Sequence, residues 1–344
     1  MSEAPALALA PPGEFVLLAG FLGSGKTSLL LDWLALPEAA DTAVIVNEAG
    51  EIDIDGAVIA TSGRLPMAML SNGCVCCSLN NDLVETVGAL LEARAESSAP
   101  PFRRIVLECS GLSMPGPILR TLGALAPLGM RVRVLATCDA GQAAERAKHF
   151  EEVAAQLAAA ATIVLTRLDL AAPQALAEAR ALVGTANPFA TLVEEADRAR
   201  RAALAFTAPL PSGAALSPTA AAAQPHPRIA TALARFTDAA TLDDKFDFLE
   251  NLAAFAGERL LRVKGFLYPH ASAAPLLVQA VGSLFTPPAT LPAAKGAEEA
   301  VVLISRDLPL SELRAAFAGA PVSFSGLQPG RPPLRAQAAA PSLD

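Results

Sequence analysis

Short apolar runs and longer segments of helical spacing alternate along the amino-terminal part of the chain. Each apolar run is rich in β-branched residues and ends at Gly, Pro or polar residues, which is typical of buried strands. Strands are predicted at 14–19, 42–47, 103–109, 131–139 and 161–166, and helices after residue 27 and at 79–95, 142–159 and 172–183. This alternation predicts an α/β fold with a mostly parallel sheet covered by helices on both faces. In such sheets, ligands bind at the carboxyl ends of the strands.

The pattern changes near residue 206. Residues 206–227 are rich in Pro, Ala and Ser without periodicity, which predicts a linker. Beyond it, a small α+β domain is predicted from helices at 243–257 and 311–319 and strands at 260–268, 275–282 and 300–307. We therefore expect a first domain at 1–205, a second at 228–330 and a disordered tail at 331–344.

Composition narrows the class of protein. The 344 residues are 53% hydrophobic and 17% charged, which suits a globular chain with large cores. A net charge of −8 argues against nucleic-acid binding. The amino terminus lacks the basic region of a signal peptide, and no apolar run is long enough for a membrane span. We expect a cytoplasmic protein with reduced thiols, because five cysteines are too few for a disulfide scaffold of this length.

The segment Gly20-Phe21-Leu22-Gly23-Ser24-Gly25-Lys26-Thr27 joins the first predicted strand to a helix. It satisfies G-x-x-x-x-G-K-[ST], in which glycines let backbone N–H groups face phosphate oxygens. Lys26 is expected to neutralise the β- and γ-phosphates, and Thr27 to offer its hydroxyl to Mg²⁺. The predicted nucleotide-contacting residues of this loop are Gly20, Gly23, Ser24, Gly25, Lys26, Thr27 and Ser28.

Two later strand ends carry further candidates. Glu108 and Gly111 follow the strand at 103–109, where a carboxylate reaches Mg²⁺ through water and a glycine approaches the γ-phosphate. Thr166, Arg167 and Asp169 follow the strand at 161–166, at the place of the guanine-reading motif N-K-x-D. Asp169 retains the carboxylate that accepts from guanine N1–H and the exocyclic amine, and the Arg167 guanidinium can stack on the base. These residues favour GTP over ATP.

Three of the five cysteines, Cys74, Cys76 and Cys77, lie in the turn Gly-Cys-Val-Cys-Cys-Ser at 73–78. Thiolates so spaced suit Zn²⁺ or Co²⁺, although cysteines also pack well in turns. The acidic segment 48–55 lies between this turn and the glycine-rich loop, and Glu48 or Glu51 is a candidate to complete the metal site. From composition alone, this segment is more typical of a solvated loop. Isolated Cys109 and Cys138 are expected to serve only in packing, near strand ends.

Taken in order, the segments GFLGSGKTSLL, VIVNEAGEIDID, NGCVCC, ECSGLSMPGPIL and LLRVKGFL resemble the CobW-type metallochaperone GTPases from about residue 14 to about residue 320. The resemblance implies a SIMIBI-like P-loop fold and GTP hydrolysis coupled to loading or release of a metal ion for a client metalloprotein. By the same resemblance Cys74, Cys76 and Cys77 match the metal motif, and Glu108–Gly111 the second phosphate motif. The chain departs from the family at Thr166 and Arg167, and its predicted linker holds one histidine, His226.

The function expected from the sequence is therefore a GTPase that binds Zn²⁺, Co²⁺ or a similar ion and delivers it under nucleotide control. The catalytic residues are expected to be Lys26 and Glu108, and the metal-binding residues Cys74, Cys76, Cys77, Glu48 and, for Mg²⁺, Thr27. GTP and GDP, a transition-metal ion and a client metalloprotein are the expected partners, and a homodimer is left open. Two alternatives are a non-enzymatic zinc-binding protein whose nucleotide site is structural, and a nucleotide-driven activator of a cofactor-dependent enzyme.

Overall fold

The structure is a computed structural model that describes residues 13–46, 67–69, 79–97, 99–128, 130–207, 226–270, 273–292 and 297–326. By their contacts these residues form two compact units. The first contains the described residues up to Ala140 together with Ala160–Ala171 and Leu192–Thr207, and the second contains Gly141–Ala159, Ala172–Thr191 and the described residues from His226 onward. Among the described helices, none has both the length and the apolar character needed to cross a membrane.

The first unit is built on a sheet whose described strands follow the order β3-β2-β4-β1-β5-β6-β7, and whose pairs from β3 to β6 are parallel. The strands are β1 Glu14–Gly20, β2 Thr42–Val46, β3 Met67–Met69, β4 Arg104–Glu108, β5 Arg131–Asp139, β6 Thr162–Thr166 and β7 Thr191–Val193. The central strand β1 is hydrogen-bonded to β4 and β5, so the carboxyl ends of these strands lie together. The predicted parallel α/β fold is confirmed.

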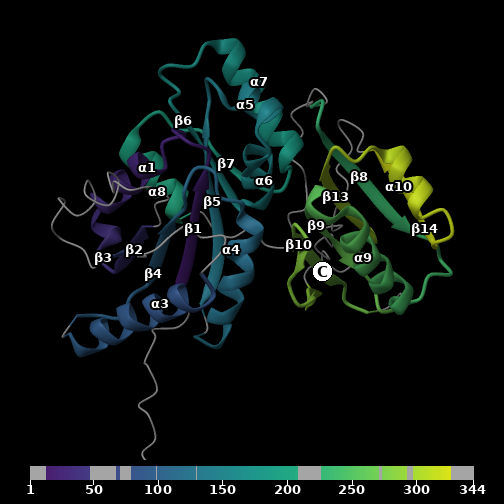
Figure 1. Cartoon of the computed structure of the whole chain (residues 1–344), viewed down its shortest axis with the longest axis horizontal. Helices are drawn as coiled ribbons and strands as arrows, with labels where there is room; N and C mark the ends of the chain where they lie inside the picture. The colour runs from purple at the N-terminus through teal and green to yellow at the C-terminus, as the bar shows by residue number, and fades with distance from the viewer. Residues whose placement is uncertain are drawn as a thin grey trace, which may run out of the picture. The chain divides into compact units, whose positions relative to one another are not determined.

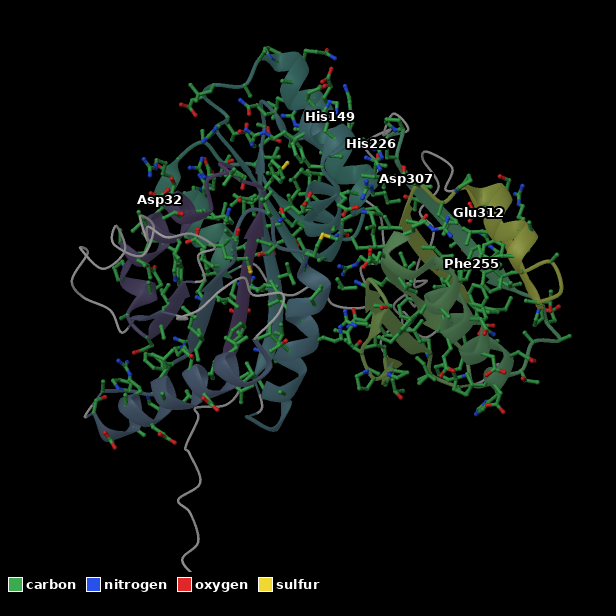
Figure 2. The ribbon with its side chains drawn as sticks, in the orientation of Figure 1. Asp32, His149, His226, Phe255, Asp307 and Glu312 are labelled. Atoms are coloured by element: carbon green, nitrogen blue, oxygen red, sulfur yellow. The ribbon has the colours of Figure 1, made fainter. Side chains whose placement is uncertain are left out.

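Helices pack on both faces of this sheet. In the first unit they are α1 Lys26–Leu34, α3 Leu79–Glu96, α4 Pro115–Leu122 and α8 Arg198–Thr207, with 3₁₀ turns η1 Pro37–Ala39 and η2 Gly123–Leu128. Figure 1 shows α1 and α8 on one face and α4 on the other. Trp33 of α1 stacks on Phe206 of α8 with ring centroids 4.8 Å apart. Asp32 of α1 accepts from Arg198 of α8 at 2.8 Å (Figure 2).

Charged groups fix the amino ends of the central strands. Glu14 of β1 pairs with Arg104 of β4 at 2.8 Å and with Arg133 of β5 at 2.9 Å. Both arginines also donate to the carbonyl oxygen of Phe206, at 2.9 and 2.8 Å. The pairs are largely buried, and each guanidinium has oxygen partners, which offsets its desolvation. Stabilising polar contacts thus occupy the amino ends of the strands, and the opposite ends carry the candidate site.

The second unit contains an antiparallel sheet with the described order β11-β10-β9-β13-β8-β14, and β12 pairs with β10. Its elements are β8 Ile229–Phe236, α9 Leu242–Ala256, η3 Gly257–Arg259, β9 Leu260–Leu267, β10 Leu276–Val281, β11 Leu284–Phe285, β12 Ala289–Thr290, β13 Ala300–Arg306, α10 Leu310–Ala316 and β14 Val322–Gly326. Phe248 of α9 packs with Phe317 and Phe324 on one face of the sheet. This confirms the predicted α+β architecture, to which β8 and β14 are additions.

Three helices that lie in sequence between strands of the first sheet belong to the second unit: α5 Ala143–His149, α6 Glu151–Ala159 and α7 Pro173–Ala186. On the face opposite α9, Thr231 of β8 donates to the carbonyl oxygen of Thr185, and Arg262 of β9 donates to the end of α6. The predicted domain boundaries at 205 and 228 stay predictions, because most of the predicted linker lies outside the described residues.

The prediction of one helix over 142–159 is wrong. Phe150 is extended, with φ −115° and ψ 122°, and separates α5 from α6. The sequence carries charges that suit two helices here, since Lys148 and His149 lie in the last turn of α5 and Glu151 and Glu152 in the first turn of α6. Cations favour a helix carboxyl end and anions an amino end, so each helix has a favourable terminus.

Candidate functional site

The loop between β1 and α1 has the backbone that its glycines permit. Gly20, Gly23 and Gly25 have φ values of 144°, 70° and 90°, which residues other than glycine rarely adopt. A Cβ on Gly20 would also lie 2.2 Å from Thr137 Oγ1 of β5. Gly25 is the left-handed residue immediately before α1. The loop therefore curls over the carboxyl end of β1 and leads into the amino end of a helix, where anions bind.

Ser24 and Lys26 are held inside this loop. The Ser24 hydroxyl lies 2.7 Å from the Thr137 hydroxyl. Lys26 Nζ donates to the carbonyl oxygen of Gly20 at 3.0 Å, and the residue is 8% exposed. The ammonium group is thus folded back over the loop, at the place where phosphate oxygens are expected. Ser28 is exposed on the first turn of α1.

The end of β4 adjoins the start of α1. The Thr27 hydroxyl donates to Glu108 Oε1 at 2.7 Å, and Glu108 is 3% exposed. The structure thus brings together the two oxygen ligands that the sequence assigns to Mg²⁺, and hard oxygen donors fit that ion. Gly111 lies against the loop, because a Cβ there would be 2.5 Å from Leu22 Cα and Leu22 N.

Thr166 at the end of β6 lies beneath the same loop. Its hydroxyl donates to the carbonyl oxygen of Ser24 at 2.7 Å and lies 3.3 Å from that of Cys138. The Thr166 hydroxyl therefore links the predicted base motif to the phosphate loop. It offers fewer hydrogen-bonding groups than the side-chain amide of the asparagine that begins the motif N-K-x-D. Arg167 has φ 54° and pairs with Asp139 Oδ2 of β5 at 3.1 Å. Asp169 is exposed, and its carboxylate has no hydrogen-bond or ion-pair partner within the part of the chain that the structure describes.

Thr137 and Asp139 are contributors that the sequence analysis did not single out. Thr137 contacts Ser24, and Asp139 holds Arg167. The sequence feature that could have identified them is their position at the end of a predicted strand, since the other parts of the site also follow strand ends. Short polar residues are common at strand ends, however, so position alone did not identify them.

The predicted metal ligands Glu48, Cys74, Cys76 and Cys77 lie outside the described residues. Within the described ranges, no group of three or more His, Cys, Asp and Glu side chains could hold a metal ion. Cys109 and Cys138 are buried, as predicted. Burial raises the pKa of the Cys138 thiol to about 12 and raises that of Cys109 as well, so neither is a thiolate at neutral pH.

The fold and this site define a P-loop nucleoside triphosphatase. Two family models match the chain: the CobW/HypB/UreG nucleotide-binding domain over residues 14–194, and the cobalamin synthesis protein cobW C-terminal domain over residues 230–320. The chain therefore belongs to the CobW family, and it is a GTPase.

Relatives with curated names agree with this membership. The zinc chaperone YjiA of Escherichia coli is 31% identical over 324 residues, which span 90% of this chain and 98% of YjiA. The zinc chaperone YeiR of the same organism is 36% identical over 162 residues, or 46% of this chain and 47% of YeiR. The crystal structure of Zn(II)-bound YjiA GTPase matches with a TM-score of 0.63 at 24% identity, over 90% of this chain and 99% of that one, so the fold is shared.

Proposed function

We propose that this GTPase is a metallochaperone that binds Zn²⁺, Co²⁺ or a similar ion at Cys74, Cys76 and Cys77 and delivers it to a client metalloprotein. The observation that carries the proposal is the similarity to the zinc chaperone YjiA, which extends over 90% of this chain and 98% of YjiA. A fission yeast relative, named zinc-regulated GTPase metalloprotein activator 1, is 27% identical over 53% of this chain and supports a metalloprotein as the client. We place this activity in the cytoplasm.

The nucleotide roles follow from the contacts of the loop. Lys26 neutralises charge on the β- and γ-phosphates, and the curled backbone of Gly20–Thr27 donates N–H groups to them. Thr27 and Glu108 would hold Mg²⁺, which neutralises phosphate charge when bound. Gly111 approaches the γ-phosphate from the end of β4. Asp169 reads guanine, and Arg167, held by Asp139, lies along the base.

The cysteine turn gives the ion a soft site. Three thiolates leave one tetrahedral position for Glu48, for water or for a ligand of the client, which suits an ion that is passed on. The acidic segment 48–55 lies in sequence between the two sites, after the second predicted strand, where nucleotide-responsive loops often lie. We infer that GTP and the metal ion favour the same conformation, so that each raises the affinity of the other by one common factor.

Calorimetric titration tests this proposal. Zn²⁺ and Co²⁺ are titrated into the protein without nucleotide, with GDP and with a non-hydrolysable GTP analogue. One tight site per chain is expected, with its highest affinity in the GTP-analogue state.

A double variant, Cys76→Ser with Cys77→Ser, supplies the matched control. It should lose tight metal binding while it keeps GTP affinity, because neither thiol belongs to the phosphate loop. Equal metal affinity in all three nucleotide states would reduce the cysteines to a static structural site. Tight metal binding that survives in the double variant would place the metal elsewhere.

A further inference from the structure

The carboxyl end of α6 is fixed by a side chain from the second sheet. Arg262 Nη1 of β9 donates to the carbonyl oxygens of Ala158 and Ala159, at 2.7 and 3.0 Å. Asn187, which follows α7, donates its side-chain amide to the carbonyl oxygens of Leu157 and Ala158, both at 3.0 Å. Three of the last carbonyls of the helix, which lack partners within it, thus receive side-chain donors.

Arg262 carries a buried charge that pairs with no carboxylate among the described residues, and its hydrogen bonds go to carbonyl oxygens. The residue is 8% exposed, and burial lowers the pKa of its guanidinium to about 10, so it stays charged at neutral pH. The partial negative charge of the helix carboxyl end is therefore the counter-charge that offsets its desolvation. Such a contact is sensitive to geometry, because moving the helix end would leave the guanidinium unpaired in the interior.

The end of α6 leads directly into the base motif. After Ala159, two residues connect the helix to β6, and Ala161 N–H donates to the carbonyl oxygen of Val134 on β5 at 2.8 Å. Strand β6 then ends at Thr166, whose hydroxyl donates to the carbonyl oxygen of Ser24 in the phosphate loop. Asp169 follows three residues later. A short, hydrogen-bonded path in the chain thus separates the contact of Arg262 from the proposed guanine reader.

We propose that Arg262 is a positioning residue for nucleotide recognition, through which the second sheet fixes α6 and thereby sets β6 and Asp169 for the guanine base. The second sheet is then a part of the nucleotide-binding machinery as well as the second unit of the fold. This inference rests on the proposed assignment of Asp169, which is tested separately below.

The test compares Arg262→Met with the wild type for GTP and for ITP, which lacks the exocyclic amine of guanine. The methionine fills similar apolar volume but cannot donate to the helix end. We expect GTP and GDP affinity to fall about five-fold, within the range for residues that act through packed neighbours. ITP affinity should fall less, so the preference for GTP over ITP shrinks, while kcat at saturating GTP stays within about two-fold of wild type. A loss of folded protein would not change that preference.

Arg259→Gln is the matched control. Arg259 precedes the same strand and pairs with Glu312 of α10 at 2.7 Å, and its ion pair involves no residue of α6. This variant should match the wild type in both nucleotide affinities. If Arg262→Met is insoluble, Arg262→Lys replaces it: the lysine keeps the charge and offers one donor group, so a partial loss in the same direction is expected.

Two outcomes separate the inference from the assignment on which it rests. If Asp169→Asn lowers GTP affinity but Arg262→Met or Arg262→Lys leaves the preference for GTP over ITP at the wild-type value, Asp169 stands and the role of Arg262 is overturned. If Asp169→Asn has no effect, the guanine assignment itself fails. In a double variant of Arg262→Met and Asp169→Asn, the effect of the first change should disappear, since it acts through the second residue.

Discussion

A few side chains fix the backbone of the phosphate loop through hydrogen bonds. The Lys26 ammonium lies on the carbonyl oxygen of Gly20, and the Ser24 and Thr166 side chains fix the loop from within. These contacts join residues of the protein to one another and hold the curled backbone of the loop in place, so each of them contributes to the shape that a phosphate would meet.

Replacing Lys26 by Ala should therefore abolish activity and leave the fold intact. Hydrolysis of GTP should fall about a hundred-fold or more, because the β- and γ-phosphates lose their main counter-ion. The free energy of unfolding should fall by about 1 kcal/mol, the usual contribution of one hydrogen bond. Initial rates and urea unfolding measure the two effects. Lys148→Ala, which removes an exposed lysine paired with Glu145, should leave the rate unchanged, and wild-type turnover in Lys26→Ala would refute the phosphate assignment.

Under the proposed function, Asp169 carries the choice of base. Asp169→Asn should weaken GTP binding and strengthen binding of xanthosine triphosphate, because the amide donates to the xanthine O2 where the carboxylate accepted from the guanine amine. Competition between GTP and xanthosine triphosphate for the wild type and for the variant measures this change in relative affinity. If the wild type hydrolyses ATP as fast as GTP, guanine selectivity does not reside in this strand end.

Lys264 of β9 titrates in an unusual range. It is 4% exposed, with its ammonium 5.4 Å from the ring centroid of Phe189. Burial, and then the charge of Arg262, lower its pKa from 10.5 to about 8. Between these values the unfolded chain binds a proton that the folded chain has released, so this group makes the free energy of unfolding rise with pH, by at most about 3 kcal/mol. Below about pH 8 it contributes no slope.

Lys264→Met tests this effect because the other titrating groups cancel in the comparison with wild type. The variant should be the more stable protein at pH 7, and its advantage should shrink steadily as pH rises toward 10. Urea unfolding of both proteins at several pH values provides the measurement. A constant difference over this range would show that the folded-state pKa of Lys264 is not lowered.

At the scale of elements, the sequence predicted what depends on local pattern. The four strands that carry the nucleotide site, β1, β4, β5 and β6, are apolar runs with clear ends, and the glycine-rich loop follows the first of them, so both were predictable. Strand β8 was missed because its sequence, Ile-Ala-Thr-Ala-Leu-Ala-Arg-Phe, is alanine-rich and has weak strand propensity. It is stabilised by β13 and β14, which come much later in the chain.

The break between α5 and α6, and the contacts within the site, could not be predicted from the sequence for a different reason. Apolar spacing continues through Phe150, so periodicity alone favours one helix. Contacts such as Thr166 with Ser24 or Thr27 with Glu108 join residues that are far apart in sequence. A motif indicates which residues share a site, but only the sheet order places their side chains within hydrogen-bonding distance.

The turn after β4 offers a test at this scale. In Gly111→Ala the new methyl group would lie 2.5 Å from the backbone of Leu22, so the turn and the phosphate loop must move apart. We expect a cost of about 1–3 kcal/mol in the free energy of unfolding and a larger loss of affinity for a GTP analogue than for GDP. Gly116→Ala in α4 is the control, because no atom lies within 4 Å of its new methyl group. Equal losses for both nucleotides would place Gly111 away from the γ-phosphate.

At the scale of the whole molecule, the contacts of the chain cut across its family domains. The nucleotide-binding domain model covers residues 14–194, yet α5, α6 and α7 within that range belong to the second unit. The two compact units of the chain therefore do not coincide with its two family domains. The proposed role of Arg262 would give a signal that originates at the nucleotide a route to the second sheet, through the connection from β6 back to α6.

Metal capture by the whole protein should be coupled to protons. If Cys74, Cys76 and Cys77 bind Zn²⁺ as thiolates, binding releases about three protons at pH values below the ordinary thiol pKa of about 8.5. The apparent affinity should then rise up to about a thousand-fold per pH unit in acid and level off above that pKa. Titration at pH 6 to 8, in buffers of different ionisation enthalpy, counts the protons. Cys74→Ser should reduce the count by one, whereas Cys138→Ala should leave it unchanged, because burial keeps that thiol protonated whether or not metal is bound. A count near zero at pH 6 would mean that the ion binds to groups other than thiols, and the proposed cargo site would have to be abandoned.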